Sequence, residues 1–183
     1  MRSIETCIKK EKWKKAERLI YEELQATPDS HWLWATLSQT LHEQHQYDKA
    51  LESVEKALSL APHCPLALWH YAGSLYMHGL AKEALAVWKK LLRRGVKSIA
   101  YGECGEGMVS ARRLVNDCNY RVGLCYAWIG NKALAVRYFR KHLENRKKGA
   151  QSSYPLSEVK KELAMVGNTG SEQNITSRDV SSG

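Results

Sequence analysis

The chain has 183 residues, 44% of them apolar, which is enough to bury a core and is typical of a globular protein. Twenty-eight Lys and Arg against 19 Asp and Glu give a net charge of +9, which weakly favours acidic partners, nucleic acid or anionic lipid. No stretch approaches 18 consecutive apolar residues, which argues against a membrane span and a membrane partner. The N-terminus lacks an apolar signal core, so we expect a cytoplasmic protein.

The cysteine content agrees with that expectation. The chain has five cysteines, an odd number, and no CxxC pair. Reduced thiols in a cytosolic protein are the simplest interpretation. Cys118 and Cys125 lie two helical turns apart, a spacing that favours two small side chains in a core.

The first 30 residues predict a short helix over 2–9 and a longer helix from Trp13 to Pro28. A fixed offset of 34 residues begins here, because Trp13 aligns with Tyr47 and Pro28 with Pro62. Thirty-four residues accommodate two short helices and two turns. We therefore interpret residues 2–30 as a shortened first copy of a repeated helical hairpin.

The next two copies occupy residues 31–64 and 65–98. In residues 31–64, apolar residues recur at helical spacing on both sides of a polar stretch at 42–46, and Pro62 follows the second helix. Residues 65–98 match less fully, with Val96 in place of that proline. Ala50 and Ala84 take the slot where the two helices of a copy would cross closely, and a larger side chain there should force the helices apart.

Residues 99–115 interrupt the period, because Ala84 and Ala135 are 51 residues apart, 17 more than the repeat. We predict an inserted glycine-rich loop here, leading into a long helix from about Met108 to Trp128. The glycines resemble a phosphate-binding loop only superficially, since no Gly-Lys-Ser/Thr follows and two glutamates would repel phosphate. Polar residues over 112–121 are interpreted as an anchor for this loop.

The last copy spans residues 116–149, with Gly130-Asn131 at its turn. Residues 155–166 predict one more amphipathic helix, which would cover the exposed apolar face at the end of the array. Together, residues 1–166 form one helical repeat domain. The composition of 167–183 is Ser, Gly, Asn, Thr and charge, which predicts a disordered tail.

These repeats resemble the tetratricopeptide family, whose pattern has a Trp, a Leu-Gly pair and a Tyr on the first helix, then two alanines, an aromatic and a proline. The best match is residues 31–64, through Trp34, Leu37, Leu41, Tyr47, Ala50, Val54, Ala57 and Pro62. The resemblance covers roughly residues 2–149. It implies an all-α, right-handed α-solenoid of about three and a half helical hairpins with a C-terminal capping helix.

The resemblance also implies a binding surface, because first helices line a concave groove in this family. The groove residues it implies are Trp32, Thr36, Gln39, His42, Trp69, His70, Tyr76, Tyr120, Arg121 and Trp128. Some family members hold acidic chaperone tails with lysines, asparagines and an arginine at such positions. This sequence has Arg121 but otherwise mostly aromatic and neutral residues there. Their aromatic rings are suited to anchoring a partner's apolar side chains, or else are covered by the chain itself.

The function we expect is that of an adaptor or scaffold that binds a peptide or helix of another protein in this groove. The alternative is a nucleic-acid-binding accessory protein that uses its basic convex face, which salt-dependent retention would reveal. No catalytic motif is readable, so we expect no enzyme and no cofactor. His42 and His45, even with His70 and His78 on the next copy, lack a further nameable ligand, so we predict no metal site. The sequence leaves the oligomeric state open.

Overall fold

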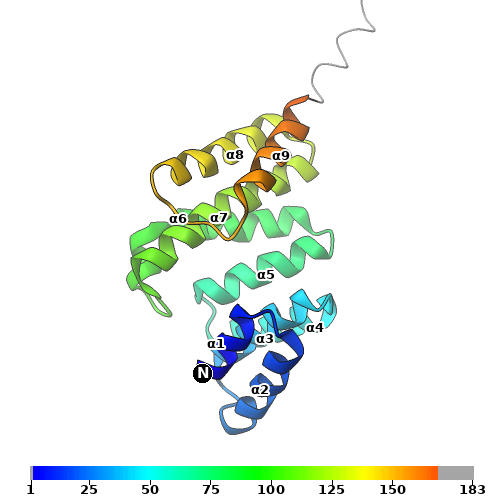
Figure 1. Cartoon of the computed structure of the whole chain (residues 1–183), viewed down its shortest axis with the longest axis vertical. Coiled ribbons are helices and arrows are strands. Elements are labelled where there is room, and N and C mark those ends of the chain that lie inside the picture. The colour runs from blue at the N-terminus through cyan, green and yellow to red at the C-terminus, as the bar shows by residue number, and fades with distance from the viewer. Residues whose placement is uncertain (1, 169–183) are drawn as a thin grey trace, which may run out of the picture.

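The computed structural model describes residues 2–168, and over that range the chain forms nine α-helices and no β-strand. The helices are α1 (Arg2–Lys9), α2 (Trp13–Ala26), α3 (His31–Glu43), α4 (Tyr47–Leu60), α5 (Pro65–Met77), α6 (Ala81–Tyr101), α7 (Gly107–Trp128), α8 (Lys132–Lys147) and α9 (Leu156–Asn168). Consecutive helices pair into hairpins, and the hairpins stack along the long axis of the molecule (Figure 1). The expected α-solenoid is therefore confirmed.

The backbone itself repeats at the turns between the two helices of each hairpin. Every such turn has one residue in the left-handed region, and the amide that follows donates to a carbonyl five residues back, at 2.8–3.0 Å. The left-handed residues are Glu11 (φ 53°), His45 (φ 60°), Gly79 (φ 77°) and Gly130 (φ 85°). This bond pattern is that of a Schellman motif. The first three turns are 34 residues apart and the fourth follows 51 residues later, the same offsets as in the side-chain pattern.

Small residues allow the paired helices to approach closely. Ala50, Ala84 and Ala135 are all fully buried at the start of a second helix. Gly123 plays the same part from α7, because a Cβ atom there would lie 2.5 Å from the ring of Phe139. Phe139 is fully buried, so a side chain at position 123 would have to displace a core aromatic.

The predicted helix from about Met108 to Trp128 is confirmed as α7, but the prediction of an inserted loop over 99–115 is wrong, because most of this segment is helical. Helix α6 kinks at Gly95 (φ 72°, ψ 166°) and then continues to Tyr101, while α7 starts at Gly107. Only Gly102–Glu106 form a turn. The added turns of helix have a core of their own, made by Ile99, Ala100 and Ala111 with the neighbouring apolar residues Val96, Met108, Leu114 and Val115. These residues follow helical spacing, a signal that the glycines between them obscured.

Helix α9 packs on α8 and also touches α7, where it covers the end of the array (Figure 1). It begins at Leu156 and extends to Asn168, so residues 167 and 168 of the predicted tail are helical. The rest of that tail, 169–183, lies outside the described residues. None of the helices from α1 to α9 combines the length and the apolar character that crossing a membrane requires.

Candidate partner-binding groove

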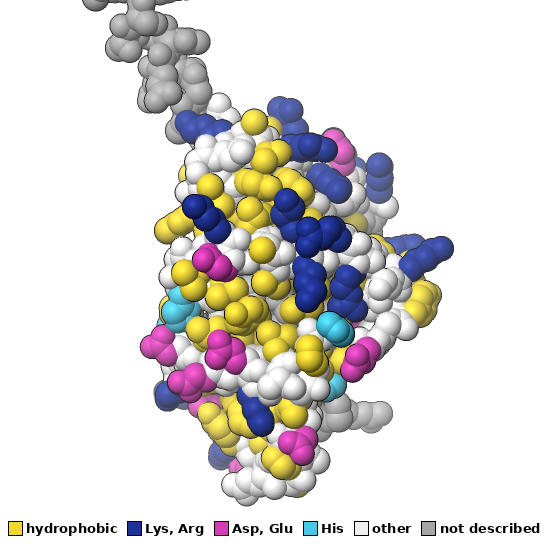
Figure 2. All heavy atoms as spheres, turned by 180° about the vertical axis from the view of Figure 1, so that it is seen from behind, with side chains coloured by type: hydrophobic (Ala, Val, Ile, Leu, Met, Phe, Trp, Pro, Cys, Tyr) yellow, Lys and Arg dark blue, Asp and Glu magenta, His cyan; other side chains and the backbone are white. Residues whose placement is uncertain are grey.

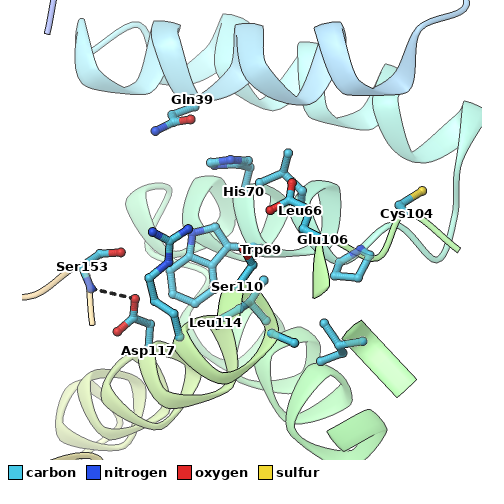
Figure 3. A pocket seen from close by; sticks show the side chains of 14 residues that line it. Gln39, Leu66, Trp69, His70, Cys104, Glu106, Ser110, Leu114, Asp117 and Ser153 are labelled. Carbon is cyan, nitrogen blue, oxygen red and sulfur yellow. Dashed lines mark hydrogen bonds between the residues drawn. The ribbon is translucent and has the colours of Figure 1, made fainter. Parts of the chain in front are cut away.

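Two adjoining pockets form one groove along the first helices of the hairpins. Their volumes are about 190 Å³ and about 260 Å³, and they share Gln39 of α3, Trp69 and His70 of α5, and Ser153. The smaller pocket extends toward the α6–α7 turn and the larger one toward Arg121 of α7. Figure 3 shows Gln39 of α3 and His70 of α5 reaching into the space between their helices. The structure thus brings three first helices to one hollow surface.

Several buried polar atoms of the residues that line the larger pocket have no hydrogen-bond partner among residues 2–168. They are Ser38 Oγ, His70 Nε2, Ser74 Oγ and Trp88 Nε1. Buried polar groups are nearly always paired in folded proteins, so such a cluster needs an explanation. Each of these atoms has almost no accessible surface, so it lies inside the pocket wall, out of reach of a ligand in the groove.

Burial favours the neutral form of both groove histidines. Burial, together with repulsion from nearby His42, lowers the pKa of His70 to about 3. Burial also lowers the pKa of His42, with added repulsion from Arg121 and His45. Neutral imidazoles donate one hydrogen bond and accept another, so they recognise polar groups more than charges.

Arg121 provides a positive charge at the larger pocket and is held in a fixed position. Its guanidinium carbon lies 5.7 Å from the ring of Trp88 and 5.1 Å from the ring of Tyr154. Its Nε donates to the Tyr154 hydroxyl at 2.6 Å. Stacking between two rings keeps an arginine extended, which lowers the entropy that binding would otherwise cost.

Five of the ten predicted groove residues line these pockets. They are Gln39, His42, Trp69, His70 and Arg121. Thr36 does not, because it is only 3% exposed and its hydroxyl donates to the Trp32 carbonyl at 2.7 Å. Trp32 is half-buried against the core formed by α1, α2 and α3. Placing these two residues in the groove was wrong, since the first turns of α3 pack toward the preceding hairpin.

Tyr120 was also wrongly placed in the groove, because the C-terminal segment covers it. Its side chain is 1% exposed, and its ring centroid lies 4.5 Å from that of Tyr154. Its hydroxyl donates to Glu158 of α9 at 2.6 Å. Burial raises the pKa of Tyr120 well above its usual value, and the bond to Glu158 adds to the rise. The residue is part of the cap and has no surface to offer a partner.

Tyr76 and Trp128 form a separate aromatic pair at the far ends of α5 and α7. Their ring centroids are 6.1 Å apart, and Tyr76 lies equally close to the buried Trp88. Trp128 is 68% exposed, whereas Tyr76 is half-buried. Neither residue lines the two pockets. The pair therefore lies beside the hairpin turns, outside the two pockets.

The segment 151–154 forms one wall of the groove, which the sequence did not reveal. Asp117 of α7 is 2% exposed and accepts from the Ser153 amide at 3.0 Å (Figure 3), while Asn116 donates to the Gln151 carbonyl at 3.4 Å. The polar residues of α7 therefore anchor this segment and not the 102–106 turn, contrary to our interpretation. The spacing of Asp117 and Asn116 gave no indication of which distant backbone they would bind.

Charge on the outer surface is unevenly distributed. Figure 2, which views the molecule from behind Figure 1, shows Lys and Arg gathered over the C-terminal half and Asp and Glu mainly over the N-terminal half. Exposed basic residues of the second helices include Lys90, Arg93, Arg137 and Arg140. These four basic residues do not line the pockets, whose charged side chains are Glu43, Glu106, Arg113, Asp117 and Arg121.

The histidines that we considered as metal ligands find other partners. His45 Nδ1 lies 2.8 Å from the Tyr47 hydroxyl, and His78 Nε2 lies 3.0 Å from Asp48. His70 faces the groove, as described. A cluster of metal-binding groups does occur elsewhere among residues 2–168, and its members are His31, Cys64 and Cys104.

Comparison with known proteins supports the fold and the repeat. The tetratricopeptide repeat family matches residues 41–102. No curated protein sequence matches the chain significantly. Among solved structures, the type IV pilus biogenesis factor PilW is 20% identical, with a TM-score of 0.69 over 90% of this chain and 66% of that one.

Two other solved structures have the same fold. The apo form of RapI is 15% identical, with a TM-score of 0.71 over 92% of this chain and 61% of that one. A MamA fragment from Desulfovibrio magneticus RS-1 is 14% identical, with a TM-score of 0.61 over 94% of each chain. The chain therefore spans only about two thirds of PilW and RapI. At these identities the likeness concerns the fold alone.

Proposed function

Since the chain contains tetratricopeptide repeats on an α-solenoid, we propose that it is a scaffold that binds an extended segment of another protein in the groove between α3, α5 and α7. The observation that carries this proposal is the hollow that Gln39, Trp69 and Arg121 line along these three first helices. An extended peptide has free backbone N–H and C=O groups to pair with the polar side chains of Gln39, His42 and Arg121. A helix has already satisfied its own backbone, which makes it the poorer ligand here.

The aromatic and cationic residues of the groove give such a segment its side-chain contacts. Trp69 presents a half-buried ring to both pockets, and Arg121 lies at one end of the larger pocket. Trp and Arg are the residue types that contribute most to protein–protein binding energy. The proposed partner therefore has an apolar side chain near Trp69 and an acceptor near Arg121. No catalytic step is part of this proposal, and a cytoplasmic location remains a prediction.

The experiment uses peptides selected from a random display library against the purified chain. The double variant Gln39→Ala, His42→Ala removes two groove side chains that come from one face of α3. Its matched control, Glu55→Ala, Lys56→Ala, changes two exposed residues of α4. We expect the groove variant to bind selected peptides at least about tenfold more weakly, and the control to bind them as the wild type does.

Equal affinity of the groove variant and the wild type, with both folded by circular dichroism, would contradict the proposal. A second arm measures retention on DNA and RNA at low and moderate salt. Binding that falls steeply with salt, and that is lost when Arg137 and Arg140 are replaced by Ala, would instead support the basic outer surface as the functional one.

A further inference from the structure

Three segments that are far apart in the sequence bring two thiols and an imidazole together. His31 is the first residue of α3, Cys64 is the N-cap residue of α5, and Cys104 lies in the turn between α6 and α7. Their possible ligand atoms all lie within 4.8 Å of one another, and Cys104 Sγ is 3.2 Å from His31 Nε2. The cluster is outside the shared part of the groove, and its existence does not depend on the proposed function.

The backbone on each side positions these groups. Cys104 has φ 60°, a left-handed conformation that is uncommon for a residue with a Cβ. The turn around it is tightly folded, because a Cβ at Gly105 would lie 2.4 Å from the Ala100 carbonyl oxygen. On the other side, Arg94 donates to the His63 carbonyl at 2.5 Å and so ties the α4–α5 turn to α6. The α4–α5 turn that carries Cys64 is thus tied to α6, and α6 leads into the tightly folded turn that carries Cys104.

The separations suit a tetrahedral metal ion. With metal–sulfur and metal–nitrogen bonds of about 2.3 and 2.0 Å, tetrahedral zinc places its ligand atoms roughly 3.5–3.8 Å apart. The 3.2 Å between Cys104 Sγ and His31 Nε2 and the 4.8 Å limit on the whole set bracket that range. Side-chain adjustments of less than about 1 Å would complete the geometry. Cys64 is 2% exposed, whereas His31 and Cys104 are half-buried, which leaves a route for an ion and a water.

The ligand chemistry selects the metal class. Thiolate and imidazole ligands favour Zn²⁺ and other soft or borderline ions, whereas Mg²⁺ and Ca²⁺ require oxygen. Glu103 and Arg94 both act electrostatically on the Cys104 thiol, and their charges have opposite signs. Two thiolates would therefore neutralise a divalent cation with little other charge at the site.

We propose that His31, Cys64 and Cys104 form a zinc site with water as the fourth ligand, which fastens the 102–106 turn to the first helices of two repeats. Cys104 and Glu106 lie on the rim of the smaller pocket (Figure 3). The ion would accordingly fix the edge of the groove formed by the inserted helical segment. A disulfide between Cys64 and Cys104 would use the same thiols, but it would not involve the imidazole of His31.

The test uses the full chain, reduced and stripped of metal with a chelator, and Co²⁺ as the probe. We expect one Co²⁺ per chain, with intense sulfur-to-cobalt absorption in the near ultraviolet and the visible bands of a tetrahedral site. One equivalent of Zn²⁺ should displace it and raise the melting temperature of the protein. Cys64→Ser, Cys104→Ser and His31→Gln should each weaken binding at least about a hundredfold.

Two matched controls should keep the wild-type spectrum. Cys7→Ser changes a buried thiol in α1, and His63→Gln changes an exposed histidine beside Cys64. The proposal is overturned if folded, reduced wild-type protein shows no sulfur-to-cobalt band, or if His31→Gln binds Co²⁺ as tightly as the wild type does. A Cys64–Cys104 disulfide found by mass spectrometry, in a chain whose reduced form binds neither Co²⁺ nor Zn²⁺, would identify a redox pair in its place.

Discussion

Trp69 and Tyr120 occupy the same position in successive repeats, yet their environments are opposite. Trp69 is half-buried and lines the open groove, whereas Tyr120 is 1% exposed beneath Tyr154. The difference arises because Trp69 lies in the middle of the array, whereas the last hairpin has no following hairpin to cover it. The chain supplies its own cover with the 151–154 segment and α9. An equivalent aromatic is therefore a groove residue in one repeat and a core residue in the next.

The largest expected effect comes from truncating the two equivalent rings. Tyr120→Ala should lower the free energy of unfolding by about 4 kcal/mol, because it removes a buried ring that contacts Phe139, His142 and Tyr154. Trp69→Ala should cost about half as much, because that ring is only partly buried. Urea titrations of both variants measure the difference. Equal losses would show that the two repeats are covered to the same extent.

Removing the cover itself should have the next largest effect. Tyr154→Ala loses the stacking on Tyr120 and leaves Arg121 Nε without its acceptor, so we expect a loss of about 3 kcal/mol. Tyr154→Phe keeps the ring and loses only the hydroxyl, for which about 1 kcal/mol is expected. If the two variants are equally stable, the contact of the rings contributes nothing to the cap.

Acidification should lower the free energy of unfolding through His70 in the groove and His142 in the last hairpin. The pKa of His70 is lowered to about 3 when folded, so the unfolded chain binds the proton more tightly between about pH 6.5 and 3. The free energy of unfolding is therefore unaffected by His70 above about pH 6.5 and falls as the pH drops below it. The loss expected from His70 is about 2 kcal/mol between pH 6.5 and 5. Burial also lowers the pKa of His142 in α8, so its effect on stability has the same sign.

The measurement compares unfolding free energies at pH 7 and 5 for the wild type, His70→Gln and His142→Gln. Each variant should depend less on pH than the wild type. A His70→Gln protein with the full wild-type pH dependence would show that His70 titrates normally in the folded chain.

The smallest effect is expected at Trp128, which is 68% exposed at the end of α7. Trp128→Ala removes mainly its contact with Tyr76, and pairs of that kind contribute about 1 kcal/mol. Its free energy of unfolding should therefore change by no more than about 1 kcal/mol, which a urea titration checks. A loss as large as that of Tyr120→Ala would mean that Trp128 is covered in solution.

Gln39, His42, Trp69, His70 and Arg121 do line the two pockets, as their spacing on one side of first helices predicts, and their part in binding a partner stays a prediction. Sequence reasoning was wrong at Trp32, Thr36 and Tyr120, where another part of the chain packs on the same side. It also missed His31, Cys64 and Cys104. The only available signal was that His31 and Cys64 stand at the starts of neighbouring first helices, while Cys104 enters from a turn whose path the sequence does not give.

The sequence by itself determined the helices, their hairpin turns and the 34-residue period, because these depend on neighbours within one or two helical turns. The tertiary structure decided which faces stay open. Covering Tyr120 and gathering two thiols with an imidazole both require contacts between residues more than 30 positions apart. Such contacts are set by where helices and turns are placed after stacking, and no local pattern of side chains encodes that placement.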